Sequence, residues 1–515
     1  MYCLIEPASR SVGMFVPAYP LPLVELASFV HSQRPEIELQ VISVPFDYGL
    51  PLSARGRDRV VAALTDDLEN LGPRAVGISC TAIAQAEEAI YLAEAIRQRL
   101  PETFIFMGGY FPTLYGEEVL ARSGAVDAVV VGEGEAALLA IVDAVEKGVD
   151  PRVQGAPNLL WQSAGDWQRT APAPRFDLKQ KGRIDLGLLK SPASFDVAPY
   201  AFSRGCPFGC TFCMEESIRP GRRAVPDDVV SADLHHLAGY SNTGTILVSD
   251  ALFKSIHLLP LIRDLGLRIN FESRCDVLDP GILAQNADVI QALAVGFESA
   301  SYDTLRRMNK VTDRAHHRRY LAGARGLFES AVSAGIPIMV FMIAGFPGDT
   351  EKDLQETLAF AESLAQSARG AGGFVFKIGE CHVYPKTRLY ELARSLPDVV
   401  FDDDGVFGQN VVRRPSKTLS FETVIETTRR VFSLSRPSGD LNRVLRQMMP
   451  FFRLPAAALT DQMIVDKCYR DRDREIFDVH GESLARFRTL VPALVDRHKE
   501  GQSAERRRRQ LDLSR

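Results

Sequence analysis

Cys206-Pro-Phe-Gly-Cys210-Thr-Phe-Cys213 places three thiols within eight residues of a 515-residue chain. Pro207 and Gly209 keep the backbone looped, so the three thiols can converge on one metal centre. Zinc sites ordinarily need a second pair of ligands, and no matching Cys or His pair lies nearby. Iron-sulfur clusters ordinarily take four thiolates, so a four-iron cluster held by this run keeps one iron open to a substrate or cofactor. The run predicts a catalytic iron-sulfur centre, and three incidental thiols are the alternative.

The composition bounds the class of protein. The apolar share of 46% and the charged share of 24% are typical of soluble globular proteins, and the length suggests three or four domains. A net charge of -5 gives no overall electrostatic case for binding nucleic acid. We expect no membrane span, because no apolar run approaches the length that a bilayer requires. The five remaining cysteines are scattered singly, which favours a reducing cytoplasm.

Residues 1–150 alternate short apolar runs with amphipathic stretches. The runs at residues 39–44, 75–79, 103–107 and 128–131 are of the kind that a parallel sheet buries on both faces. Between two of them, residues 83–100 carry apolar side chains along one helical face. This alternation predicts a doubly wound, Rossmann-like α/β domain.

Small residues follow the predicted strands of this domain, where doubly wound sheets bind ligands. Glycine there lets a backbone approach a large ligand closely, although tight turns need glycine equally. The residues that we expect to bind a cofactor are Ser79, Thr81, Gly108, Gly109, Tyr110, Gly132, Glu133 and Gly134.

Three further regions follow. Proline and glycine punctuate residues 151–198, which we expect to form a linker. Within residues 199–400, five apolar runs follow the strand that enters Cys206, and the repeated strand-helix pattern predicts a partial (β/α)6 barrel. The runs lie at residues 245–249, 268–272, 290–296, 338–344 and 374–378. Residues 401–515 carry helical patterns at 421–434 and 484–495 and are expected to form a C-terminal helical domain.

Polar residues and one glycine stand at the ends of the predicted barrel strands, where barrels carry their active sites. One charged residue at a strand end is commonly a cap, whereas a series at one mouth favours a functional site. The series is Asp250, Arg274, Glu298, Ser299, Gly345, Glu380 and His382. We expect His382 and Glu380 to be catalytic, because an imidazole exchanges protons near neutral pH. A hydrogen-bonded structural histidine is the equally open alternative.

The cysteine run resembles that of the radical S-adenosylmethionine (SAM) superfamily. Residues 296–301 (GFESAS) with 308–310 (MNK), 344–350 (AGFPGDT) and 384–393 (YPKTRLYELA) resemble the motifs of its fourth, fifth and sixth strands. In the last of these, Lys386 replaces a more usual glycine. The resemblance implies a 4Fe-4S cluster on Cys206, Cys210 and Cys213, with SAM bound to the open iron.

The same resemblance implies the contacts to SAM. Phe212 is expected to lie near the adenine, Arg274 and Glu298 to hold the ribose or the carboxylate, and Gly345 to let the adenosyl group approach the backbone. Asp250 and Ser299 are expected to belong to the same cofactor site.

Residues 1–150 resemble the cobalamin-binding domain that precedes many radical SAM barrels. The similarity lies in residues 76–79 (VGIS), 108–113 (GGYFPT) and 129–138 (VVVGEGEAAL). No Asp-x-His-x-x-Gly sequence occurs, so the resemblance implies a cobalt without a protein imidazole beneath it.

Together the resemblances imply an enzyme that cleaves SAM reductively, with cobalamin as a methyl carrier. The first hypothesis is a C-methyltransferase acting on a small biosynthetic intermediate, supplied with electrons by an external donor of the flavodoxin or ferredoxin type. The second is an oxidative cyclase or ring-rearrangement enzyme with the same cofactors. A non-catalytic iron-sulfur or cobalamin-binding protein is the third, and failure to cleave SAM would favour it. A methylthiotransferase is disfavoured, because no second cysteine triad lies upstream.

Overall fold

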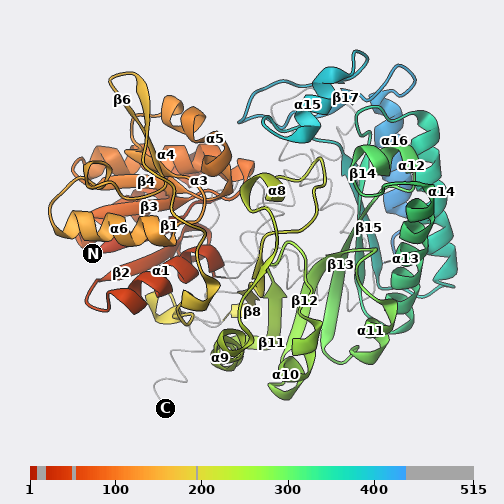
Figure 1. Ribbon diagram of the computed structural model, residues 1–515, viewed down its shortest axis with the longest axis horizontal. Helices are drawn as coiled ribbons and strands as arrows, with labels where there is room; N and C mark the ends of the chain where they lie inside the picture. Colours follow the sequence, from red (N-terminus) through yellow and green to blue (C-terminus); the bar gives the residue numbers. More distant parts are fainter. Residues whose placement is uncertain (9–18, 49–53, 193–194, 437–515) are drawn as a thin grey trace.

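The computed structural model describes residues 1–8, 19–48, 54–192 and 195–436 (Figure 1). The helix predicted at residues 484–495 and the basic end at residues 506–509 lie outside this range. Within it, no helix combines the length and the apolar character needed to cross a bilayer.

The N-terminal sheet has seven strands in the order β2-β1-β3-β4-β5-β6-β7, of which the first five are parallel. These strands are β1 (Tyr2–Glu6), β2 (Leu39–Ser43), β3 (Ala75–Ser79), β4 (Phe104–Gly108), β5 (Ala128–Val130), β6 (Leu159–Ser163) and β7 (Asp166–Arg169). The sheet's helices are α1 (Leu21–Gln33), α2 (Val44–Asp47), α3 (Ala54–Leu71), α4 (Ile83–Arg99), α5 (Tyr110–Arg122), α6 (Glu135–Glu146) and α7 (Pro151–Gln154). Apolar side chains on both faces of the sheet are buried, which confirms the doubly wound α/β prediction.

The hairpin of β6 and β7 was not predicted. Residues 151–198 were expected to form an irregular linker, but β6 pairs antiparallel with β5 and β7 with β6. Trp161 lies on β6 and is partly buried, whereas Trp167 on β7 is exposed. The hairpin therefore extends the N-terminal sheet by two strands before the chain enters the second sheet.

The second sheet has six parallel strands in the order β15-β14-β13-β12-β11-β8, which confirms the predicted partial barrel. They are β8 (Phe195–Tyr200), β11 (Ser241–Val248), β12 (Arg268–Arg274), β13 (Ile290–Glu298), β14 (Ile338–Ala344) and β15 (Phe374–Glu380). The helices that follow these strands are α9 (Asp227–Ala238), α10 (Leu259–Asp264), α11 (Pro280–Gln285), α12 (Tyr302–Arg307), α13 (Arg314–Ser333) and α14 (Glu351–Ser367). In Figure 1, α11, α13 and α14 lie along the outside of the sheet, away from the N-terminal domain. α9 lies on the side of that domain, and its Asp233 pairs with Lys181.

Several short elements follow the cysteine loop and the last barrel strand. α8 (Glu215–Ile218) follows the cysteine loop, and a two-residue ladder joins β9 (Ser203–Arg204) to β10 (Arg223–Ala224). After the last barrel strand come α15 (Arg388–Ser395), β16 (Val400–Phe401), β17 (Val412–Arg414) and α16 (Phe421–Ser433). The helix predicted at residues 421–434 is thus present, and its Phe432 packs against Val375 of the barrel sheet.

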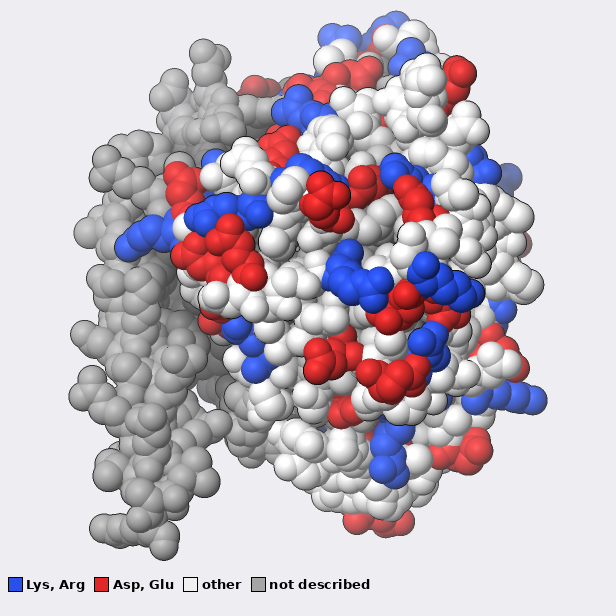
Figure 2. Space-filling view, turned by 90° about the vertical axis from the view of Figure 1, so that its left-hand side faces the viewer, with Lys and Arg blue, Asp and Glu red and all other residues white. Residues whose placement is uncertain are grey.

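Charged residues of both signs are mixed on the face of the molecule that Figure 2 shows. Figure 2 shows Lys and Arg interspersed with Asp and Glu on the side of the molecule where the N-terminal domain lies. This view agrees with the near balance of 60 basic and 65 acidic residues in the sequence.

Candidate functional site

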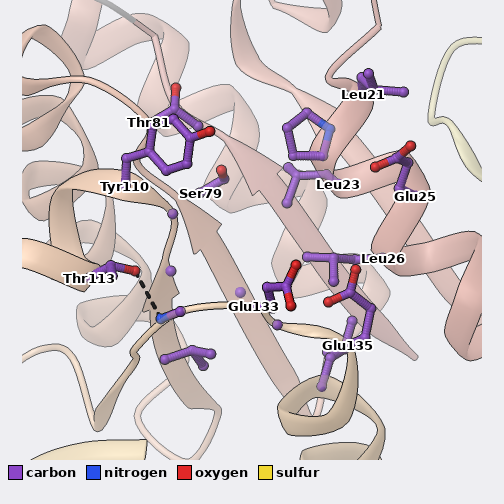
Figure 3. Close-up of a pocket in the computed structure, with 18 of the residues that line it drawn as sticks. Leu21, Leu23, Glu25, Leu26, Ser79, Thr81, Tyr110, Thr113, Glu133 and Glu135 are labelled. Atoms are coloured by element: carbon purple, nitrogen blue, oxygen red, sulfur yellow. Dashed lines mark hydrogen bonds between the residues drawn. The ribbon is translucent and has the colours of Figure 1, made fainter. Parts of the chain in front are cut away.

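A cavity of about 390 Å³ lies at the carboxyl ends of the N-terminal strands (Figure 3). All eight residues that the sequence predicts to bind a cofactor in this domain line the cavity: Ser79, Thr81, Gly108, Gly109, Tyr110, Gly132, Glu133 and Gly134. They come from the ends of β3, β4 and β5, whose parallel order brings those ends to one edge of the sheet.

Gly132 and Gly109, which both line the cavity, have different structural roles. A side chain at Gly132 would enter open space, because no heavy atom lies within 4 Å of the position of its Cβ. Its amide donates to the Thr113 hydroxyl at 3.0 Å, shown dashed in Figure 3. A side chain at Gly109 would instead meet the carbonyl oxygen of Cys80 at 2.5 Å. Gly132 therefore keeps the cavity open, whereas Gly109 lets two strand-end loops pack together.

The barrel supplies the other wall of the cavity. The lining residues from this side are Ala201, Ser203, Arg204, Ile218, Arg219 and Ser249. Arg219 lies with its guanidinium carbon 4.6 Å from the centre of the Tyr110 ring, across the two domains. The cavity thus lies between the strand-end loops and the segment that carries the cysteines.

The three cysteines of the run are free thiols on one loop. Burial is the main cause that raises the pKa of the Cys213 thiol to about 11, and the nearby Cys210 and Cys206 contribute to that rise. The three thiols are not arranged to hold a single metal ion. A cluster of several irons presents separate metal atoms to separate thiolates, which this donor set fits.

The MNK segment holds the cysteine loop in place. Thr211 donates its backbone amide to the Met308 carbonyl at 3.1 Å, and Asn309 donates its side-chain amide to the Gly209 carbonyl at 2.7 Å. Arg388, at the start of α15, donates to the same Gly209 carbonyl at 2.6 Å. The fourth and sixth motifs of the barrel therefore fix the backbone between the cluster thiols.

Arg274 lies against the same loop. It donates to the Cys210 sulfur at 3.6 Å and to the Lys310 carbonyl at 3.1 Å, and it pairs with Asp276 through two hydrogen bonds of 2.9 Å. Its guanidinium also lies 4.0 Å from the centre of the Phe208 ring. Burial disfavours the charge, but Asp276 outweighs that effect and raises the pKa of Arg274. The structure thus gives Arg274 partners inside the protein, and a contact with SAM stays a prediction.

Protein partners also occupy three other residues of the predicted SAM site. Asp250 accepts hydrogen bonds from the Phe202 and Ser203 amides and from the Ser203 hydroxyl, and burial raises its pKa to about 6. The hydroxyl of Ser299 hydrogen-bonds Thr357 at 2.9 Å. A side chain at Gly345 would meet Val424 of α16 at 2.9 Å. These contacts are structural, so the assignment of Asp250, Ser299 and Gly345 to SAM remains an expectation.

Glu298 stands at the end of β13 in a strained conformation, with a φ of 69°. Its carboxylate accepts a hydrogen bond of 2.9 Å from Lys310, whose ammonium lies 5.9 Å from the centre of the Phe212 ring. The structure therefore brings two residues of the predicted SAM site, Glu298 and Phe212, close to the Lys310 ammonium. The sequence singled out Lys310 only as part of a motif.

Glu380 is the last residue of β15, and His382 follows two residues later. Their closest nitrogen and oxygen atoms, Nε2 and Oε1, are 3.9 Å apart. Nδ1 of His382 lies 2.9 Å from the carbonyl oxygen of Gln409, which can only accept a hydrogen bond. The neutral imidazole therefore presents Nε2 as an acceptor toward the side of Glu380.

Several cavity residues were not predicted. Glu25, Arg204 and Glu135 line the cavity and are buried, and Figure 3 shows Glu135 beside Glu133 and Glu25 beside Leu23. In the sequence, only their proximity to recognised motifs could have indicated two of these residues. Arg204 precedes the cysteine run, and Glu135 belongs to the GEGE sequence at residues 132–135.

Comparisons with known proteins agree with this architecture. The B12 binding domain model matches residues 40–142, and the radical SAM superfamily model matches residues 200–361. The anaerobic magnesium-protoporphyrin IX monomethyl ester cyclase of Rubrivivax gelatinosus is 28% identical over 58% of this chain and 58% of its own. The hopanoid C-3 methylase of Methylococcus capsulatus is 26% identical over 56% of each chain, so the similarity spans less than two thirds of both relatives.

A solved structure has the same fold. The radical SAM methyltransferase TsrM from Kitasatospora setae superposes with a TM-score of 0.66 at 17% identity, covering 85% of this chain and 89% of its own. The cavity and the cysteine loop fit the cofactors that the matching models imply: cobalamin in the former, a 4Fe-4S cluster with SAM at the latter. The chain belongs to the radical SAM enzymes that carry an N-terminal cobalamin-binding domain.

Proposed function

We propose that the chain is a cobalamin-dependent C-methyltransferase acting on a small biosynthetic intermediate. One observation carries the proposal: the cobalamin cavity has one wall from the N-terminal loops and the other from the segments on either side of the cysteine loop. A methyl carrier held there would lie beside the cysteine segment of the barrel, whose Arg204 and Arg219 line the same cavity. The domains proposed are residues 1–150 for cobalamin, 199–400 for the barrel and 401–515 as a helical cap. Of the segment 151–198 between the first two, the β6–β7 hairpin extends the N-terminal sheet.

The bound cofactors supply a methyl group, its carrier and a carbon-centred radical, and the protein positions them and excludes water. Cys206, Cys210 and Cys213 hold the cluster. Arg274 donates a hydrogen bond to the Cys210 sulfur at 3.6 Å and so helps to orient this ligand. The Arg219–Tyr110 contact closes the gap between the domains next to the cavity.

Glu298 is proposed as the main protein contact to SAM. Strained backbone at the end of a central strand is typical of functional sites. The φ of 69° at Glu298 holds its carboxylate against Lys310, within the region bounded by Phe212. Electrons would come from an external flavodoxin- or ferredoxin-type donor.

His382 is proposed to handle a proton at the barrel mouth. Because Nδ1 donates to the Gln409 carbonyl, Nε2 can take a proton in the neutral ring, and Glu380 would stabilise the resulting cation. His382→Gln should lower product formation at least about tenfold while leaving cluster and cobalamin content unchanged. Unchanged product formation would assign His382 a structural role.

The function is tested with the anaerobically reconstituted full chain, SAM with a labelled methyl group, a strong reductant and candidate substrates. We expect S-adenosylhomocysteine and 5'-deoxyadenosine in roughly equal amounts, together with a product that carries the label. Formation of 5'-deoxyadenosine with an unlabelled product would contradict methyl transfer.

An oxidative cyclase is the second candidate, and the similarity to the anaerobic protoporphyrin ester cyclase favours it. The same experiment separates the two functions. A cyclase gives no S-adenosylhomocysteine, and its product is cyclised or rearranged rather than heavier by a methyl group.

A further inference from the structure

The inner face of the barrel sheet carries side chains that remain accessible. Phe376 of β15 stacks on Phe328 of α13, with the ring centres 6.0 Å apart, so Phe376 faces the outer helices. Because successive residues of a strand point to opposite faces, the next residue, Lys377, faces the interior of the barrel, and its side chain is exposed. Phe341 lies beside Lys377 in register on β14 and is partly exposed. Side chains at this level of the barrel are therefore accessible to a ligand.

Glu272 of β12 faces the same interior. Its neighbours in the strand, Phe271 and Ser273, are buried, whereas Glu272 is exposed. Arg274, two residues later and thus on the same face, reaches the cysteine loop, where it donates to the Cys210 sulfur. A strand rises about 3.3 Å per residue, so Glu272 lies about 7 Å deeper in the barrel than the arginine beside the cysteines.

The Glu272 carboxylate is accessible but enclosed by protein. Burial is the main cause that raises the pKa of Glu272; the charge of Lys377 opposes the rise, and that of Glu298 adds to it. Within the described part of the chain, this carboxylate takes part in no hydrogen bond and no ion pair. Keeping an unpaired carboxylate in a poorly solvated place costs free energy. The position therefore favours a ligand that brings the missing cation.

The level of Glu272 coincides with the wall of the cobalamin cavity. Leu247 of β11 lies opposite Asn270 of β12, and continuing this register by two residues brings Ser249 to the level of Glu272. Ser249 is exposed and lines the cavity. A group bound at Glu272 therefore lies beside the place proposed for the methyl carrier.

We propose that Glu272 binds a cationic amine of the substrate inside the barrel, with the apolar or aromatic body of that substrate against Phe341. This assignment rests on the proposed function, since it places the methyl acceptor beside the cobalamin cavity. A protonated amine supplies both the charge and the N–H donors that the carboxylate lacks. The Lys377 ammonium, 5.4 Å from the centre of the Phe341 ring, disfavours a second cation in the same place.

The proposal is tested with two small probes that share an aromatic body. Phenethylamine carries an ammonium group near neutral pH, and phenethyl alcohol carries a neutral hydroxyl instead. Each is titrated by calorimetry into the reconstituted full chain loaded with methylcobalamin and SAM, without reductant, so that no SAM is cleaved. We expect wild type to bind phenethylamine at least about tenfold more tightly than the alcohol, and Glu272→Gln to bring the two affinities within about twofold of each other.

Glu356→Gln is the matched control, because Glu356 lies on α14 outside the barrel, where it pairs with Lys352 at 3.8 Å. It should keep the wild-type preference. Glu272→Ala serves as a second variant should Glu272→Gln not fold, and it should lose the preference in the same way. Equal binding of the two probes to wild type, binding of neither, or a preference kept without the carboxylate would overturn the proposal. Since no methyl transfer is measured, a failure here is separate from failure of the proposed function.

Discussion

The Tyr115 hydroxyl donates to the Pro385 carbonyl at 2.7 Å, across 270 residues of sequence. The next residue, Lys386, has a φ of 61° and reaches back to α5, with its ammonium 2.9 Å from the Leu114 carbonyl and 2.8 Å from Glu118. Together these contacts join the cobalamin domain to the end of the barrel.

Lys386→Ala should destabilise the chain by about 1 kcal/mol, because it keeps the strained φ and loses both contacts to α5. Lys386→Gly removes the strain as well, so its free energy of unfolding should lie above that of Lys386→Ala. Urea unfolding of the three proteins measures the difference. Equal stability of the two variants would show that the φ of residue 386 carries no strain.

Cys210→Ala should abolish the cluster and all SAM cleavage, because two thiolates cannot replace three. Iron and sulfide analysis after anaerobic reconstitution, with about four irons expected in wild type, checks this. Cys275→Ala, which removes a buried thiol outside the loop, should retain the cluster. Loss of the cluster in that control would refute the ligand assignment.

Gly132→Ala should lower cobalamin occupancy several-fold, because the added methyl group enters the open cavity. Gly148→Ala is the control: its φ of 70° carries a similar strain, and its Cβ also meets open space, but it does not line the cavity. Absorbance of the bound corrin at equal protein concentration separates the two variants. Matching losses in both would attribute the effect to backbone strain.

Glu6→Gln should change how stability depends on pH. Burial raises the pKa of Glu6 from 4.5 to about 7, and the hydrogen bond from Ser43 opposes the shift. The stability held by the protonated form is complete below about pH 4.5 and is lost as the pH rises through 7, by up to about 3 kcal/mol. Gln loses nothing over that window, so the variant should gain on wild type between about pH 5 and about pH 8 in urea unfolding. A difference that stays constant with pH would contradict the shift.

The sequence predicted the elements whose signal is local. Apolar runs gave five of the six barrel strands and four strands of the N-terminal sheet, and glycines marked the cavity before any contact was known. The short strand β1 (Tyr2–Glu6) was not predicted. The hairpin was missed because prolines on both sides hid its short strands.

The sequence could not predict which side chains far apart in the chain form hydrogen bonds with one another. Asp250 stands at a strand end as expected, yet its oxygens bind residues 202–203. Arg204 has no periodic or motif signal of its own, and only folding brings it to Glu25, 179 residues earlier. The sequence can place a residue at the end of a strand. The hydrogen bonds of its side chain depend on the other segments that fold against that strand end.

The edges of the N-terminal sheet have a consequence for solubility. On one side, β7 is four residues long, and its exposed side chains include the charges of Asp166 and Arg169. On the other side, the amide of Lys190 donates to the Val41 carbonyl of β2 at 2.8 Å and covers that edge. Neither border offers a long unpaired strand, so the sheet resists adding strands from another chain and is guarded against aggregation.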